Sequence, residues 1–126
     1  MEWKLMYVEL KTGYNDDGPA WIGKAFFSKT GKSIYFNNLF LKGGTGGGTK
    51  YEINSGDAYW VSGVKKNEQD RHWAGFGKIQ IDKSIVPDYL KLIEREMLPK
   101  NKFEIVELNN NPSKQTINEI ENTIAD

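Results

Sequence analysis

The chain has 126 residues, a formal net charge of zero and no cysteine. This length gives room for one domain, and a hydrophobic fraction of 38% with 13% aromatic residues is enough for a compact core. Neutrality argues against a dedicated duplex-DNA binder, which needs a concentrated basic face. The missing cysteines exclude disulfides, thiolate metal sites and a cysteine nucleophile.

The first part of the chain alternates strand-like runs with turn signals. Residues Trp3–Leu10 are apolar on both alternating faces, which is typical of an interior strand. After the turn signal at Asn15–Pro19, the runs Ala20–Ser28 and Ser33–Asn37 predict a hairpin with a short glycine-containing loop. Two shorter runs are expected to continue the sheet: Leu39–Lys42 and Tyr51–Ile53.

Two glycine-containing segments between these runs resemble phosphate-binding loops. Lys29–Ser33 ends in Gly-Lys-Ser, but position 26 is Phe26 where the motif needs its first glycine, and the segment joins strands instead of opening a helix. We therefore interpret it as a hairpin turn. Gly43–Thr49 could cradle an anion, and its glycine content favours the simpler interpretation of a flexible connector.

A second hairpin is predicted from Tyr59 to Ile81. Pairing Lys66 with Arg71 sets the indole of Trp60 opposite Gly77, so that glycine leaves space for the large ring. On this register the residues expected to face the core are Trp60, Val64, Trp73, Ile79 and Ile81.

The other face of this hairpin is the candidate binding surface, because it would gather aromatic and cationic side chains. Arg71 and Lys65 could hold an anion there. Asp70 and His72 share a face of an extended strand, so the carboxylate could orient the imidazole as a general acid or base. The candidate ligand-binding residues are Tyr59, Lys65, Asp70, Arg71, His72, Phe76 and Lys78.

The hydrophobic period changes from strand-like to helical after this hairpin. Ser84 can cap a helix with Pro87 in its first turn, and apolar residues recur at helical spacing until Pro99. Lys102–Leu108 predicts one more strand. A last helix from about Pro112 would carry an apolar stripe of Ile117, Ile120 and Ile124.

Together these elements predict a mainly β (α+β) fold. We expect a small SH3-like or OB-like antiparallel barrel or bent sheet, with one or two C-terminal helices. Residues 1–98 would form the barrel-like domain with its closing helix, and residues 99–126 a C-terminal extension of a strand and a helix.

Several of these motifs resemble a family of small bacterial proteins. The resemblance rests on Gly18–Gly23 (GPAWIG), Ile34–Asn37 (IYFN) and Tyr59–Lys66 (YWVSGVKK) followed by Asp70–Gly75 (DRHWAG), and it covers residues 1 to about 93. Some members carry the enzyme name 1-deoxyxylulose-5-phosphate synthase. A thiamine-diphosphate enzyme needs several domains and a metal-diphosphate site, which this chain lacks, so the resemblance implies a bacterial origin and no mechanism.

The sequence therefore favours a non-enzymatic binding or protein-interaction module that uses an aromatic and cationic surface. The alternative is a small enzyme acting on a phosphodiester or another anionic substrate, with His72 as acid or base. We expect no cofactor, no metal and no catalytic residue set. A protein or peptide is the expected partner, ahead of single-stranded nucleic acid, for a cytoplasmic monomer or homodimer that does not enter the membrane.

Overall fold

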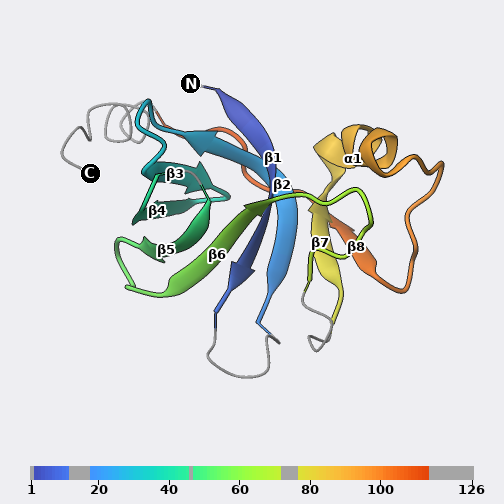
Figure 1. The fold of residues 1–126 in the computed structure, drawn as a ribbon, viewed down its shortest axis with the longest axis horizontal. Helices are drawn as coiled ribbons and strands as arrows, with labels where there is room; N and C mark the ends of the chain where they lie inside the picture. The colour runs from blue at the N-terminus through green and yellow to red at the C-terminus, as the bar shows by residue number, and fades with distance from the viewer. Residues whose placement is uncertain (1, 12–17, 46, 72–76, 114–126) are drawn as a thin grey trace.

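The computed structural model describes residues 2–11, 18–45, 47–71 and 77–113 (Figure 1). These residues form a sheet of eight strands and one short helical segment. The strands are β1 (Trp3–Leu10), β2 (Ala20–Phe27), β3 (Ser33–Phe36), β4 (Leu39–Gly43), β5 (Gly48–Glu52), β6 (Ala58–Gly63), β7 (Ile79–Asp82) and β8 (Phe103–Val106). The helical segment is a 3-10 turn η1 (Lys83–Ile85) that runs into α1 (Val86–Ile93).

The first six strands close into an antiparallel barrel. Each pairs with the next in the chain, and β6 returns to β1, where Val8 lies opposite Val61. Apart from the closing pair of β1 and β6, neighbouring strands of the barrel are consecutive in the chain, so their connections are short. The predicted small antiparallel barrel is confirmed, as are the first strand and the hairpin of β2 and β3.

The predicted hairpin between Tyr59 and Ile81 is wrong. Both edges of β6 are occupied, by β1 and β5, so Trp60 lies opposite Glu9 and Thr49 instead of Gly77. The strand β7 runs parallel to β2, with Ile22 opposite Ile81, and β8 adds in parallel to β7. β7 can pair with β2 because β3 contacts only the last residues of β2, Phe26 and Phe27. The first half of the same edge of β2 is therefore open to β7.

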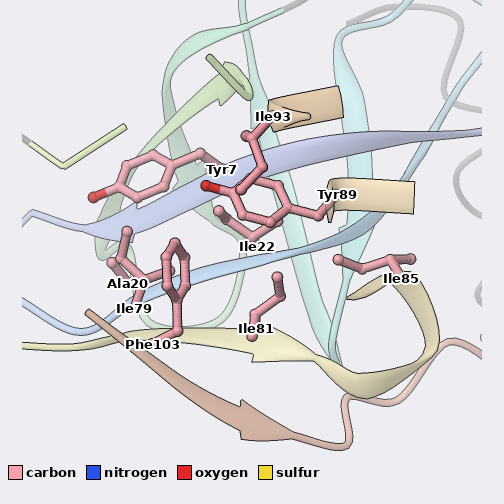
Figure 2. Close-up of a cluster of buried hydrophobic side chains, with 9 residues drawn as sticks. All are labelled: Tyr7, Ala20, Ile22, Ile79, Ile81, Ile85, Tyr89, Ile93 and Phe103. Atoms are coloured by element: carbon pink, nitrogen blue, oxygen red, sulfur yellow. The ribbon is translucent and has the colours of Figure 1, made fainter. Parts of the chain in front are cut away.

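Two main clusters of buried side chains lie on opposite sides of β1 and β2. The barrel core fills the barrel and consists of Met6, Val8, Ala25, Ile34, Phe36, Leu41, Tyr59 and Val61. The outer core lies between the barrel wall and the layer of α1, β7 and β8, and consists of Tyr7, Ala20, Ile22, Ile79, Ile81, Ile85, Tyr89, Ile93 and Phe103 (Figure 2). Alternation along β1 sends Met6 and Val8 inward and Tyr7 outward, which explains its two apolar faces.

Side-chain placement in the second half of the chain follows from this arrangement. Ile79 and Ile81 are buried as predicted, and Val64 packs partly buried against the outer core. Trp60 is 40% exposed, which corrects its predicted core position, because its neighbours Tyr59 and Val61 take the inward face. Trp73 lies outside the described residues.

The helix forms where the sequence predicts one, but it is shorter. The predicted capping role of Ser84 is wrong, because Ser84 lies inside η1, where its backbone N–H donates to the carboxylate of the capping residue Asp82. The helix α1 itself begins after Ile85 without a side-chain cap, with Pro87 in its first turn. Glu94 adopts a left-handed conformation with φ of 58° and ends the helix before Met97, which is 70% exposed.

The segment after β8 returns to the barrel. Leu108 packs against the barrel core, and Asn110 donates a hydrogen bond of 2.6 Å to the Asp82 carboxylate. Residues 114–126, with the predicted stripe of Ile117, Ile120 and Ile124, lie outside the described residues. Within the described part of the chain, no helix has the length and apolar character needed to cross a membrane.

Candidate functional site

A cavity lined by described residues opens at one end of the barrel. Its volume is about 650 Å³, and it lies where the start of β1, the β2–β3 turn and the β4–β5 loop meet. This size is in the range of small-molecule sites, which often occupy the mouths of β-barrels. We call it the mouth pocket; it is lined by Glu2, Lys4, Met6, Phe27, Ser28, Lys29, Thr30, Gly31, Thr45 and Gly47.

The mouth pocket combines an apolar wall with cationic side chains. Met6 belongs to the barrel core, and Phe27 packs against the same core from the end of β2. The Lys4 ammonium lies 5.2 Å from the centre of the Phe27 ring, which is the geometry of a cation–π contact. Lys29 is exposed in the turn beyond Phe27. One acidic side chain, Glu2, opposes these two cations at the rim.

The turn that carries Lys29 is a tight hairpin connection, as predicted. The N–H of Ser28 donates to the carbonyl of Ser33 at 2.9 Å, and the N–H of Gly31 donates to the carbonyl of Ser28 at 3.0 Å. Gly31 has φ of 76°, a conformation that side chains disfavour. The Gly-Lys-Ser resemblance to a phosphate-binding loop thus reflects turn geometry, although the same turn forms one wall of the pocket.

A fully buried lysine joins the two loops that line the mouth pocket. Lys50 points into the barrel from β5, and its side chain has no exposed surface. Its ammonium donates to the carbonyl of Gly44 at 2.5 Å and to those of Gly31 and Lys32 at 3.5 Å each. Burial of a charge requires such acceptors. Lys50 therefore ties the β2–β3 turn to the β4–β5 loop behind the pocket wall.

The structure separates several of the candidate residues that the sequence predicted. Tyr59 is buried in the barrel core, where its ring centre lies 6.4 Å from that of Trp21. Lys65 and Lys78 are exposed, the first after β6 and the second just before β7. Because β6 and β7 do not pair, the shared face on which this surface depended is not formed. His72 and Phe76 lie outside the described residues.

Asp70 and Arg71 do belong to one polar group, beside the outer core. One carboxylate oxygen of Asp70 accepts the backbone N–H of Lys65 at 2.7 Å, which closes a turn. Arg71 donates to the carbonyl of Gly18 at 3.1 Å. Burial raises the pKa of Asp70, and the hydrogen bond and charge of Lys65 offset this only in part. The arrangement holds the connection after β6 against the barrel wall.

Tyr7 and Glu9 of β1 extend this polar group. The Tyr7 hydroxyl donates to the Glu9 carboxylate at 2.5 Å, and Lys11 pairs with the other oxygen of Glu9 at 3.1 Å. Burial raises the pKa of Tyr7 well above its ordinary value, with further increases from the hydrogen bond and charge of Glu9. The hydroxyl therefore stays protonated and acts as a donor.

The described residues hold no cluster of three or more His, Asp or Glu side chains suited to a metal ion. Neither a family model nor a curated protein or solved structure matches this sequence. The case for a function therefore depends on the geometry and chemistry of the mouth pocket.

The sequence did not predict the residues that line most of the mouth pocket. Its cations come from the start of β1 and from the β2–β3 turn, and Lys50 of β5 lies behind its wall, in contact with Gly31. For the glycine-rich β4–β5 loop the sequence favours a flexible connector over an anion cradle, and the structure places Thr45 and Gly47 of this loop in the lining of the cavity.

Proposed function

We propose that this chain is a non-enzymatic binding module that holds an anionic ligand with an apolar part in the mouth pocket. The observation that carries the proposal is the pairing of Phe27 and Met6 with two lysines, Lys4 and Lys29, in a cavity of about 650 Å³. An apolar wall supplies affinity, and a few placed polar groups set orientation and charge preference.

The charges around the mouth pocket favour a negative group. Lys4 and Lys29 outnumber Glu2 among the charged side chains of the lining. A carboxylate near Lys29 could then place its apolar chain along Phe27. Either a small organic acid or the C-terminal residue of a peptide has this chemistry.

Further aromatic and cationic side chains next to the mouth pocket support this proposal. Beside the pocket, on the outer side of the barrel, the Lys24 ammonium lies 4.8 Å from the centre of the Trp3 ring. Trp3 is 42% exposed. This second cation–π pair would extend the surface available to a peptide that reaches beyond the mouth.

Calorimetric titration with a matched pair of probes tests this proposal. Hexanoate and hexanamide differ in charge but little in shape, so hexanoate should bind more tightly, and its advantage should shrink as salt is added. An acetylated tetrapeptide ending in phenylalanine, with a free or an amidated C-terminus, tests the peptide source. Binding of the free-acid peptide well above that of hexanoate would identify the peptide.

The double variant Lys4→Gln/Lys29→Gln should weaken hexanoate binding by about 2- to 30-fold, since two exposed charge interactions contribute about 0.2 to 1 kcal/mol each. Lys100→Gln/Lys102→Gln is the matched control, because both lysines are exposed and precede β8, outside the pocket lining. Equal affinity for the acid and the amide, or an equal loss in both double variants, would contradict the proposal.

A further inference from the structure

A second cavity, at the opposite end of the barrel, has a different chemical character. It lies where β3 ends, β4 begins and β5 ends, and the segment after β8 forms its remaining wall. Its volume is about 460 Å³. We call it the asparagine pocket; it is lined by Tyr35, Asn38, Leu39, Phe40, Ile53, Asn54, Asn109, Asn111 and Ser113.

The wall of this pocket is held in place by its own hydrogen bonds. Asn109 donates from its backbone to the side chain of Asn37 at 2.9 Å and from its amide to Asn38 at 2.6 Å. The Tyr35 hydroxyl donates to the carbonyl of Asn109 at 3.2 Å. These contacts fasten the C-terminal segment to the β3–β4 turn, in which Asn37 and Asn38 have φ of 44° and 70°. The pocket is therefore built before any ligand arrives.

Amide groups facing this pocket still have hydrogen-bonding capacity. Within the described part of the chain, the side-chain amides of Asn54 and Asn111 make no hydrogen bond; only their backbone N–H groups do. Asn38 uses its carbonyl oxygen and keeps two N–H donors. The amides of Asn54 and Asn111 therefore offer donors and an acceptor side by side, and Asn38 adds two donors. This set matches the hydroxyl groups of a polyol.

The described lining of the asparagine pocket carries no charged side chain. An anion would find no cation there and a metal ion no carboxylate, so neutral ligands are favoured. The apolar part of the lining is small and one-sided. Phe40 packs partly buried against Phe26 and Tyr35, whose ring centres are 6.0 Å apart, and Ile53 is 50% exposed.

We infer that the asparagine pocket binds a neutral saccharide, with ring hydroxyls bonded to the amides of Asn38, Asn54 and Asn111. The C–H face of the sugar ring then lies against Phe40 and Ile53. A cavity of about 460 Å³ accommodates a monosaccharide or part of a disaccharide. This site is separate from the mouth pocket, so the failure of either proposal leaves the other standing.

NMR titration of the ¹⁵N-labelled chain tests this inference. The probes are maltose, cellobiose, sucrose and N,N′-diacetylchitobiose, each to about 50 mM, which detects millimolar dissociation constants. At least one should shift the side-chain amide signals of Asn54 and Asn111 in a saturable way. Asn54→Ala and Asn111→Ala should each weaken that binding about fivefold or more, as expected for one lost hydrogen bond.

Asn101→Ala is the matched control, since Asn101 is exposed in the turn before β8 and outside the pocket. The exposed positions of Asn54 and Asn111 keep the variants folded, which unchanged backbone spectra would verify. Absence of saturable shifts with all four sugars would overturn the inference. So would binding that survives both substitutions, or a stronger response of the same signals to adenosine or to sodium glucuronate.

Discussion

At the scale of single residues, the buried polar side chains mostly fasten connections to the barrel. Asp82 is the clearest case, with 2% of its surface exposed and hydrogen bonds from Asn110 at 2.6 Å and from the Ser84 hydroxyl at 2.8 Å. Backbone N–H groups of Ser84 and Leu108 also point at it. Burial alone raises the pKa of Asp82, but these donors outweigh it and hold the pKa below 3.8.

This balance predicts the pH dependence of an Asp82→Asn variant. Because the pKa is lower in the folded state, the carboxylate stabilises the fold above the ordinary value of 3.8, and that stabilisation is lost as the pH falls through the folded pKa. At pH 7 the variant should lose about 1 to 3 kcal/mol of unfolding free energy, because an amide cannot accept from all these donors. The difference in unfolding free energy between the variant and the original chain should become smaller below about pH 4.

Urea denaturation from pH 7 to pH 2.5 measures this gap. Asp57→Asn is the control, since Asp57 is exposed. Asp70 contributes with the opposite sign, because its raised pKa penalises the fold at neutral pH and the penalty disappears on acidification. It is unchanged in both variants and cancels in the comparison. A gap that stays constant down to pH 2.5 would mean that Asp82 is not held ionised.

At the scale of elements, the entry to β7 depends on a glycine for a reason other than the predicted one. The sequence suggested that Gly77 makes room for Trp60, yet a Cβ atom at Gly77 would meet nothing within 4 Å. Its backbone has φ of 92°, which side chains rarely adopt. Gly77→Ala should therefore cost about 1 to 2 kcal/mol through backbone strain, and the larger Gly77→Val should add no overpacking penalty.

Chemical denaturation of the two variants distinguishes these explanations. If backbone strain is the cause, both variants should have similar denaturation midpoints, except for a small difference from the stiffer β-branched side chain of valine. Gly63→Ala serves as the control, because Gly63 has open space around its Cβ position and no positive φ. A much larger loss for valine than for alanine would restore the packing explanation.

Local patterns predicted those elements whose partners are adjacent in the chain. The strand Trp3–Leu10 and the β2–β3 hairpin agree with the sequence because alternation and turn residues act over short distances. The predicted Tyr59–Ile81 hairpin is wrong because its two strands pair with strands that are distant in sequence and not with each other. β6 closes the barrel on β1 instead, and Tyr59 and Val61 turn inward, which sends Trp60 out.

The difference between local and distant contacts also explains why the sequence did not predict the two pockets. The mouth pocket brings together β1, the β2–β3 turn and the β4–β5 loop, and no spacing along the chain relates Lys4 to Lys29 or Lys50. In the sequence, the run Asn109–Asn111 only separates the predicted strand Lys102–Leu108 from the helix predicted after it. Its part in the asparagine pocket depends on contacts with Asn37 and Asn38, far away in sequence.

At the scale of the whole molecule, the barrel core and the outer core share strands. β1 and β2 contribute residues to both, with Met6 and Tyr7 adjacent on the chain and on opposite sides of the wall. Loss of the outer layer would expose Tyr7 and Ile22 of these strands, which are essentially fully buried. The two cores should therefore unfold together.

This coupling predicts the behaviour of one substitution in each core. Leu41→Ala in the barrel core and Ile85→Ala in the outer core remove fully buried side chains, so each should cost about 2 to 5 kcal/mol. Ile105→Ala, at a side chain that is 57% exposed, should change the free energy of unfolding by no more than about 0.5 kcal/mol.

In all three variants far-UV circular dichroism and tryptophan fluorescence should report the same single denaturation midpoint. Trp21 packs against the barrel core, so its emission reports on that core. If Ile85→Ala shifted the dichroism midpoint while the fluorescence midpoint stayed where it is in the original chain, the outer layer would be unfolding by itself and the barrel would be an independently stable unit.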